Sequence, residues 1–425
     1  MQQVLFPDDV QFWYETLRSF GHIAYGGADF GEVLAISEQI TAGDYDSWHD
    51  AYLSAADRLA GEAQAALRAG HRVSARDGWL RASNYYRSAD FFLHGHPDDP
   101  RHHHAYDRSV ACFQAAAPLL ATPAQPVAIP YENTTLPGYF YAAANLGAAN
   151  LGADPDAANP AADLPRPIVI MHTGFDGSAE EMHFAGAAAA AERGYHVLVF
   201  DGPGQAGPIH RQGLVFRPDW ENVVGPVIDF ALTLPGVDTS KIVLWGLSMG
   251  GVLAPRAAAF DHRLAALVAV DGVYDMGQTA RGHAGLDPEL DGRLRAETDP
   301  ELDAELAQLI TASPVMRWAV DQAQYVFGAP SPRRAAGAFL DYHVRDGIAE
   351  QITCPALICD APADLFFAGQ ARQLFDHLTC PKTWLEFTAE EGADAHCQVG
   401  AQRLAASRIL NWLDGTLAHQ LKMVH

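Results

Sequence analysis

The stretch IVLWGLSMGGVLAPRAAAF, residues 242–260, decides the fold class of this 425-residue chain. It begins with the apolar run Ile242–Trp245, which predicts a buried strand, and it ends in a helical pattern from Gly250 to Phe260. A G-x-S-x-G sequence centred on Ser248 lies between them. Its glycines allow a turn so sharp that larger side chains would clash, which exposes the serine hydroxyl at the start of the helix. This order of strand, turn and helix predicts that Ser248 is a nucleophile.

A serine nucleophile needs a histidine base and a carboxylate that orients the base. In this topology the acid follows the serine along the chain, and the histidine follows the acid. Asp360 ends the apolar strand at 356–359, and Asp364 lies in the loop beyond it. We favour Asp364 as the acid, because a loop residue can reach across to a histidine, and we assign Asp360 to capping. The expected base is His396, which follows a strand at 383–387 and precedes a C-terminal helix.

Acyl transfer also requires hydrogen-bond donors for the negative charge that develops on the substrate oxygen. One expected donor is the backbone N–H of Met249, the residue after the nucleophile. The second is expected in the loop 172–177, where Gly174 lets the backbone turn inward and Phe175 supplies the N–H. His172 has suitable chemistry, but we expect a histidine at a strand end to hold the loop in place.

Short apolar runs alternate with helical patterns from about residue 165 onward. Nearly continuous apolar strands are typical of a parallel sheet with helices on both faces, so the predicted fold class is α/β with a mostly parallel, doubly wound sheet. The expected strands are 167–171, 196–200, 242–245, 264–270, 356–359 and 383–387. The expected helices are 179–193, 220–234, 250–260 and 400–417.

The first 125 residues have a different character. Apolar residues recur there at helical spacing, interrupted at Gly70 and at 95–97, without strand-like alternation. We therefore expect an all-helical N-terminal domain over residues 1–125 and a catalytic domain over 126–425. The second domain is expected to contain a hairpin at 127–131 and 138–141, a polar loop over 147–165 and a helical insertion over about 276–349.

Composition excludes several classes of function. Asp and Glu number 52 against 28 Lys and Arg, and a net charge of −24 repels nucleic-acid phosphates and anionic lipid surfaces. No apolar run approaches the roughly 18–20 residues of a membrane helix, and the N-terminus lacks the pattern of a secretory signal. The five cysteines fit neither a metal spacing nor a disulfide framework, so we expect a cytoplasmic protein. With nucleic acids and membranes excluded, the expected partner is a small molecule.

Two more groups of residues have suitable chemistry for a site. His94, His96 and the run 102–104 suggest a metal, but adjacent residues on a loop rarely converge on one ion, and no cysteine or carboxylate spacing supports them. We therefore expect no metal site and no cofactor. Asp271 and Asp275 end the strand after the nucleophile's strand. They either cap a loop or supply an auxiliary carboxylate that orients or protonates the substrate.

Further motifs carry a resemblance to a known family. They are LRASNYYRSA (80–89), DPR (99–101), IPYE (129–132), LPGY (136–139), DGPGQ (201–205), GLSMG (246–250), DGVYD (271–275) and AHCQ (395–398). Over nearly its whole length the chain resembles the FrsA-like esterase branch of the α/β-hydrolases. Within that branch it is similar to the bacterial 2,6-dihydroxypseudooxynicotine hydrolase and to fungal heptaketide hydrolases of the yellowish-green pigment type.

The resemblance implies an α/β-hydrolase fold in which an N-terminal helical cap domain lies over the catalytic domain, with the active site between them. It implies a Ser248–Asp364–His396 triad, a homodimer, and hydrolysis of a C–C bond beside a ketone in an aromatic or polyketide-like substrate. The pseudooxynicotine enzyme pattern includes an extra glutamate, whereas the matching stretch 276–280 here has no acid. Either Asp275 replaces that glutamate, or the chemistry is plain ester hydrolysis.

Other activities stay open at this point. The same triad serves a carboxylesterase or lactone hydrolase, and it serves an acyltransferase if the pocket favours an alcohol or amine over water. A non-catalytic binding protein would keep the fold and lose the chemistry. The presence of all three triad residues in the expected order argues against that last alternative.

Overall fold

An eight-stranded sheet forms the centre of the molecule in the computed structural model, which describes residues 3–143, 165–282 and 285–423. The strand order is β1-β2-β4-β3-β5-β6-β7-β8. β1 and β2 form an antiparallel hairpin, β2 pairs antiparallel with β4, and the other neighbours are parallel. The strands are β1 (Ala124–Tyr131), β2 (Thr134–Tyr141), β3 (Arg166–His172), β4 (His196–Phe200), β5 (Val237–Leu247), β6 (Leu264–Val270), β7 (Ala356–Asp360) and β8 (Lys382–Glu386). The expected mostly parallel α/β sheet is confirmed.

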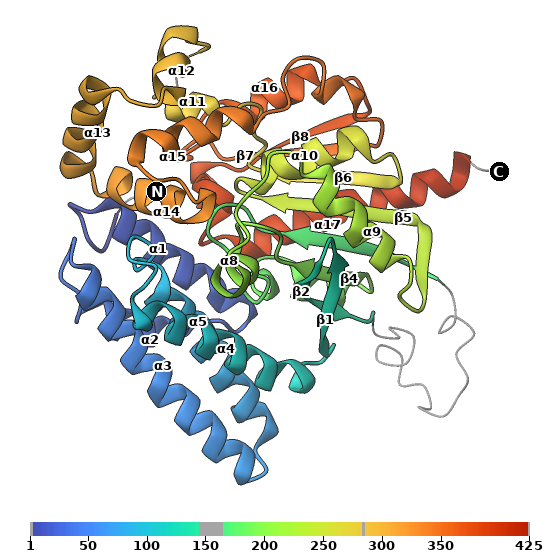
Figure 1. Cartoon of the computed structure of the whole chain (residues 1–425). Coiled ribbons are helices and arrows are strands. Elements are labelled where there is room, and N and C mark those ends of the chain that lie inside the picture. Colours follow the sequence, from blue (N-terminus) through green and yellow to red (C-terminus); the bar gives the residue numbers. More distant parts are fainter. Residues whose placement is uncertain (1–2, 144–164, 283–284, 424–425) are drawn as a thin grey trace.

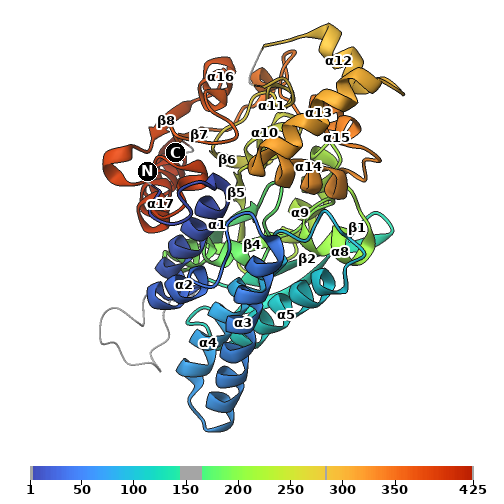
Figure 2. The same ribbon diagram turned by 90° about the vertical axis from the view of Figure 1, so that its left-hand side faces the viewer.

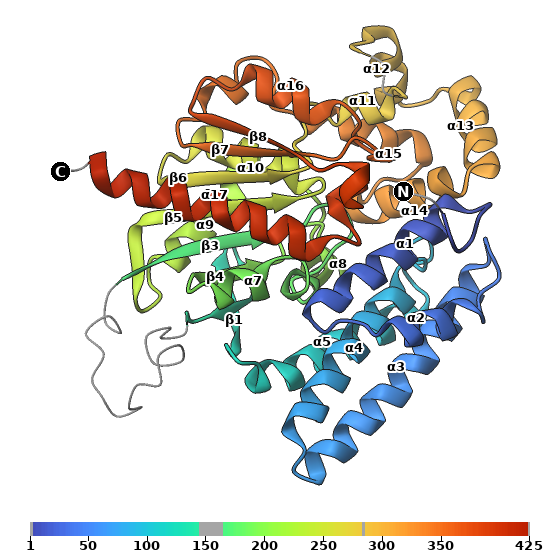
Figure 3. The ribbon, with the colours of Figure 1, turned by 180° about the vertical axis from the view of Figure 1, so that it is seen from behind.

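Helices cover both faces of this sheet, because the central strands are apolar on both sides; every residue of β4 and β6 is buried. α7 (Ala187–Glu192) and α17 (Gln402–Met423) cover one face (Figure 3). α9 (Glu221–Ala231), α10 (Gly250–Phe260) and α16 (Gln370–His377) cover the other. Right-handed crossovers between parallel strands produce this division. In the described ranges, no helix combines the length and the apolar character that crossing a membrane requires.

Helices also fill the region before the sheet, as the sequence predicts. They are α1 (Val10–Gly21), α2 (Phe30–Ser37), α3 (Tyr45–Arg68), α4 (Arg72–Asp90) and α5 (Pro100–Ala116). Asp9, Asp29, Asp44 and Asp99 precede α1, α2, α3 and α5, and each side chain accepts a hydrogen bond from an N–H of the first turn. Those N–H groups have no partner within the helix, so the aspartates fix where the helices begin.

A second group of helices lies between β6 and β7, as expected for an insertion. It comprises α11 (Gly277–Ala280), α12 (Pro288–Arg295), α13 (Pro300–Ala312), α14 (Pro314–Phe327) and α15 (Pro332–Ala338). Four of these begin with a proline after an Asp or Ser cap, the usual start of a helix. Figures 1 and 2 show this group above the blue N-terminal helices, and α1 contacts α14.

One hydrophobic core extends through the N-terminal helices and the sheet. On the helical side, the ring of Phe12 lies 4.8 Å from Trp48 and 4.9 Å from Phe92, measured between centroids. The same core continues into the strands and into α17. The helices therefore share a core with the sheet, and the domain boundary near residue 125 remains a prediction.

Several elements differ from the sequence-based expectations. The helix expected over 179–193 is reduced to α7 and a 3₁₀ turn at Glu181–His183, because Gly186 between them has a φ of 151° that no helix accommodates. The short helices α8 (Ala206–Gln212) and α16 were not predicted, and β5 begins at Val237 rather than Ile242. The polar loop expected over 147–165 lies almost wholly outside the described residues.

Candidate active site

Ser248 lies in the turn that joins β5 to α10, at the carboxyl edge of the sheet. Its φ of 61° is in the left-handed region, which costs a non-glycine residue about 1–3 kcal/mol. Glycines make the turn possible. A Cβ on Gly246 would collide with the backbone of Gly250, and a Cβ on Gly250 would lie 2.9 Å from the carbonyl oxygen of Thr173. The turn therefore has the sharp, strained form that the sequence predicts.

The structure brings the other two predicted triad residues to this turn. His396 Nε2 lies 2.9 Å from Ser248 Oγ, and His396 Nδ1 lies 2.8 Å from Asp364 Oδ2. Asp364 Oδ1 accepts hydrogen bonds from the backbone N–H groups of Phe366 at 2.7 Å and Phe367 at 3.0 Å. These two bonds fix the carboxylate in its loop. Hydroxyl, imidazole and carboxylate form the linear arrangement in which a histidine can take a proton from serine.

A second carboxylate also faces the imidazole. Asp271 Oδ2 lies 2.9 Å from His396 Nδ1, and the same side chain accepts hydrogen bonds from the N–H of Cys397 and from Nε2 of Gln398. Asp271, Cys397 and Gln398 all have positive φ values. Asp271 therefore holds a strained turn behind His396 and contacts the base directly. Asp360, the alternative acid, is the last residue of β7, where burial raises its pKa to about 6.

Burial and charge act in opposite directions on His396. Burial disfavours the imidazolium and is the largest single effect, but the electrostatic contributions of Asp364 and of the groups around it, Asp271 among them, together outweigh it. The pKa of His396 is therefore raised well above its usual range. The two carboxylates thus favour the protonated form of the imidazole.

The loop after β3 passes directly beside the nucleophile turn. A Cβ on Gly174 would collide with the backbone nitrogen of Met249, so glycine alone permits this approach. The next residue is Phe175, whose carbonyl accepts a hydrogen bond from Gln322 Nε2 on α14 at 2.7 Å. The two peptide groups expected to supply oxyanion donors therefore lie on adjoining segments.

Gln205 anchors this loop from the D-G-P-G-Q turn, a role that sequence reasoning missed. Its Nε2 donates to the carbonyls of Thr173 at 2.7 Å and Gly174 at 3.3 Å, and its Oε1 accepts from the N–H of Gly202 at 2.7 Å. His172 is fully buried, with Nδ1 2.9 Å from the carbonyl of Thr173. Burial lowers the pKa of His172 to about 4, and its contacts are those of a residue that holds the loop.

A pocket opens onto Ser248. Its walls come from α1, from the loop after β3, from α14 and from the loop that carries Asp364. Six of the residues that line it carry aromatic rings: Tyr14, Phe175, Trp318, Phe339, Phe366 and Phe367. Tyr14 was not singled out from the sequence, because its helical spacing resembles that of core aromatics; its hydroxyl donates to the carbonyl of His396 at 3.4 Å. A mainly apolar pocket with a few polar groups fits a small organic molecule.

Buried charges at the α1 side of the pocket neutralise one another. Arg18 donates to Glu181 at 2.6 and 2.7 Å and to Asp176 at 3.1 Å. Glu15 lies 3.4 Å from Arg18, and burial raises the pKa of Glu15 to about 7. Arg87 lies 3.6 Å from Glu181. Because these arginines are already paired, the network favours docking of α1 and α4 over capture of an anionic substrate.

Asp275, the other auxiliary candidate, is paired with arginines. Its carboxylate lies 3.2 Å from Arg281 and 3.4 Å from Arg345, and it accepts the N–H of Gly277 at 2.9 Å. Its side chain is almost completely buried, and it is not among the residues that line the pocket at Ser248. These contacts favour loop capping over proton transfer to a substrate.

The chain is similar to known proteins in family, in sequence and in structure. A model described as the alpha/beta hydrolase family matches residues 168–406. The chain belongs to the alpha/beta hydrolase family. Hydrolase acrC of Aspergillus aculeatus is 34% identical over 96% of this chain and 97% of its own length. The 20-hydroxy-prefusarin hydrolase FUS2 of Gibberella moniliformis is 32% identical, over 96% of each chain.

The crystal structure of a 2,6-dihydroxy-pseudo-oxynicotine hydrolase has the same fold. Its TM-score is 0.67 at 22% sequence identity, and the match covers 93% of this chain and 94% of that one. The expected fold, the family resemblance and the assignment as a hydrolase are confirmed. The curated relatives also match almost end to end, so the similarity includes the helices that precede the sheet.

Proposed function

We propose that this hydrolase cleaves a C–C bond beside a ketone in a polyketide-like or aromatic small molecule, through an acyl-enzyme on Ser248. The observation that carries the proposal is the chain of contacts from Ser248 Oγ to His396 at 2.9 Å and from His396 to Asp364 at 2.8 Å. The family resemblance supports the type of bond. The aromatic pocket and the similarity to a 20-hydroxy-prefusarin hydrolase support a small organic substrate.

In the first step Ser248 Oγ attacks the ketone carbon while His396 Nε2 takes its proton. The carbonyl oxygen becomes an oxyanion, for which the N–H groups of Met249 and Phe175 are the proposed donors. For a β-dicarbonyl substrate, the tetrahedral intermediate collapses by breaking the C–C bond to the carbon between the two carbonyls, which leaves as an enolate. The imidazolium of His396 protonates that carbon. Water, deprotonated by His396, then attacks the acyl-enzyme and releases the acid and free Ser248.

One observation favours a second candidate, a carboxylesterase or lactone hydrolase. Asp275 is paired with Arg281 and Arg345, so it does not replace the auxiliary glutamate of the pseudooxynicotine enzyme pattern. An alkoxide leaving group needs only the proton held by His396, whereas an enolate must be protonated at carbon. An acyltransferase would use the same acyl-enzyme and transfer it to an alcohol or amine.

The proposed function uses the two domains predicted from the sequence. Residues 1–125 form a helical cap, residues 126–425 form the catalytic domain, and the substrate lies between them. The presence of both Tyr14, from α1, and Ser248, from the sheet edge, in the lining of the pocket supports this arrangement. A homodimer and a cytoplasmic location are further parts of the proposal that derive from the resemblance and from the composition.

The test compares a 1,3-diketone series with aryl esters, using wild type, Ser248→Ala and the exposed control Ser240→Ala. Cleavage of a diketone to an acid and a ketone, present in wild type and Ser240→Ala and lost in Ser248→Ala, supports the proposal. Ser248-dependent turnover of esters alone selects the second candidate. Products that incorporate an added alcohol or amine select the acyltransferase. Diketone cleavage retained by Ser248→Ala overturns the mechanism.

A further inference from the structure

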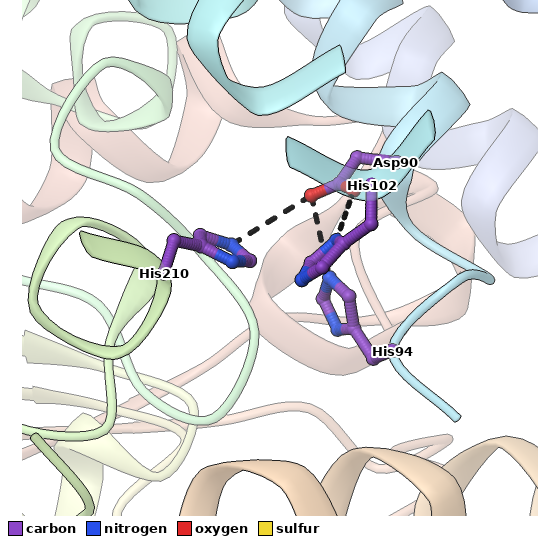
Figure 4. A group of neighbouring side chains, drawn as sticks. All are labelled: Asp90, His94, His102 and His210. Carbon is purple, nitrogen blue, oxygen red and sulfur yellow. Dashed lines mark hydrogen bonds and ion pairs between the residues drawn. The ribbon is translucent and has the colours of Figure 1, made fainter. Parts of the chain in front are cut away.

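Four buried side chains meet away from the nucleophile, where α4 and α5 contact α8 (Figure 4). Asp90 ends α4, His94 follows it in the connection to α5, His102 is on α5, and His210 is on α8. One ligand atom from each residue lies within 4.8 Å of the other three. The four side chains are between 0% and 8% exposed. Dashed lines in Figure 4 join the Asp90 carboxylate to all three imidazoles.

The separations between these atoms suit a four-coordinate ion. Asp90 Oδ2 lies 3.4 Å from His94 Nε2 and 3.7 Å from His210 Nε2. Ligands of tetrahedral zinc, at about 2.0–2.1 Å from the metal, are about 3.3 Å apart. His102 Nδ1 lies 2.5 Å from Asp90 Oδ1 in a direct hydrogen bond. A bound ion would take the place of that one bond, and the other two separations need to change by only a few tenths of an ångström.

The outward-facing ring nitrogens already have partners. Gln322 Oε1 contacts His94 Nδ1, and Tyr325 Oη lies 3.2 Å from His102 Nε2 and 2.8 Å from His210 Nδ1. Metal-bound histidines almost always donate their second N–H to such an acceptor, which orients the ring. All three histidines are therefore held with one nitrogen toward Asp90 and the other toward α14.

The orientation of Gln322 fixes the proton on His94. Gln322 Nε2 donates to the carbonyl of Phe175 at 2.7 Å, so Gln322 Oε1 is the atom that faces His94 and accepts from Nδ1–H. A neutral His94 then directs its Nε2 lone pair at the Asp90 carboxylate, 3.4 Å away. Two electron-rich atoms in a buried site repel each other, so a cation must lie between them, either a metal ion or the second proton of an imidazolium.

We propose that Asp90, His94, His102 and His210 bind one divalent transition-metal ion, with Zn²⁺ the best match to three imidazoles and one carboxylate in a closed site. This differs from the sequence-based expectation that the histidines of residues 94–104 bind no metal. His96, His103 and His104 are exposed and are not part of this cluster. The expectation did not consider Asp90 or the remote His210, which supply the carboxylate and the third imidazole.

The ion would connect segments far apart in sequence. Its ligands lie on α4, α5 and α8, and their hydrogen-bond partners Gln322 and Tyr325 lie on α14. Four protein ligands leave no open position, so the expected role is structural. Because the ion binds only the folded chain, its binding free energy adds to the free energy of unfolding.

The test uses the untagged full-length protein, stripped with a chelator and dialysed against Zn²⁺ or Co²⁺. Metal content is measured by elemental analysis, and the Co²⁺ form is examined by visible absorption. The variants are His94→Gln and His210→Gln, and the matched controls are the exposed neighbours His96→Gln and His103→Gln. We expect one ion per chain in wild type and both controls, with a higher melting temperature when it is bound. We expect at least a tenfold weaker affinity in the two ligand variants, consistent with loss of a direct ligand.

The absorption spectrum separates this site from a binding site at the nucleophile. Tetrahedral Co²⁺ with nitrogen and oxygen ligands gives d–d bands without sulfur charge transfer, whereas a site that includes Cys397, with His396 and Asp271, would add a thiolate band. A thiolate band overturns the assignment. Wild-type protein that binds less than one ion per chain would also overturn the assignment, and this result does not depend on any variant. Ligand variants that bind metal as tightly as wild type also overturn it.

Discussion

Asp271 and Asp364 point carboxylate oxygens at the same atom, Nδ1 of His396, from 2.9 and 2.8 Å. The two acids come from the loops after neighbouring parallel strands, β6 and β7. Their remaining contacts differ. Asp364 is fixed by two N–H groups of its own loop, whereas Asp271 bonds to the turn that carries the histidine. We infer that Asp364 orients the base and that Asp271 holds the position of the turn and tunes the charge of the base.

The two acids should therefore respond differently to the same substitution. Asp364→Asn puts an amide where Nδ1–H must donate, which favours the wrong tautomer; kcat should fall by roughly 10³–10⁴-fold. Asp271→Asn keeps an acceptor for the turn and leaves Asp364 in place, so kcat should fall by about tenfold or less. Steady-state kinetics of the two variants, with circular dichroism as the folding control, shows which of the two acids orients the base. A larger loss in Asp271→Asn than in Asp364→Asn would assign the acid to Asp271.

The pH dependence of kcat/KM should report the charge of Asp271. His396 acts as a base only when neutral, so activity is lost as the pH falls through its pKa. Asp271 contributes to raising that pKa, and Asp271→Asn removes the negative charge. The acid limb of the profile should therefore move to lower pH in the variant. The control Asp238→Asn, whose partly exposed side chain pairs with Lys241, should leave the limb in place. An acid limb that moves to higher pH or does not move in Asp271→Asn would show that the charge of Asp271 does not affect His396.

Gly174→Ala should abolish activity in a protein that still folds. The added Cβ would collide with the backbone nitrogen of Met249, which pushes apart the two segments proposed to hold the oxyanion. Loss of one oxyanion donor costs roughly 10²–10³-fold in kcat. Gly225→Ala is the matched control, because a Cβ there meets nothing within 4 Å and alanine favours the helix. A nearly normal kcat in Gly174→Ala would show that this loop does not contribute to stabilising the oxyanion.

Gln205→Ala should lower kcat with little effect on KM. The side chain donates to the carbonyls of Thr173 and Gly174 but is not itself among the residues that line the pocket at Ser248. Without these hydrogen bonds the loop can shift, and a displacement of about 1 Å can cost roughly 100-fold. Gln205→Glu accepts from Gly202 but cannot donate, so it should resemble the alanine variant. Gln212→Ala, on an exposed side chain of the same helix region, serves as the control. An effect on KM alone would indicate a role in substrate binding instead.

Local patterns in the sequence predicted the sheet and the nucleophile turn. The glycines of the G-x-S-x-G stretch indicate a sharp turn without any other information. Buried parallel strands are recognisable because they are continuous apolar runs. Helix ends were predictable where a cap residue or glycine marks them, but Gly186 broke a helix that apolar spacing alone extends from 179 to 193. Short helices such as α8 bury too few residues to give a periodic signal.

The rest of the site depends on contacts between distant segments. The sequence indicated an acid in the loop after β7. It did not indicate that Asp271, in the loop after the neighbouring strand β6, also contacts Nδ1 of His396. Tyr14 faces the pocket from a helix whose sequence pattern marks only a buried face. Asp90 and His94 are four residues apart, the spacing of neighbours on a helix face, and this signal was available. His210 lies more than 100 residues away, and nothing local connects it to them.

Covalent labelling tests the central claim, the activation of Ser248, most directly. Wild type, Ser248→Ala and Ser240→Ala are treated with a fluorophosphonate, and the adduct is read by intact mass and located by peptide mapping. We predict one adduct per chain on Ser248 in wild type and Ser240→Ala, and none in Ser248→Ala. Labelling that persists in Ser248→Ala, or folded wild type that does not react even with a small phosphonate able to enter the pocket, would contradict the account.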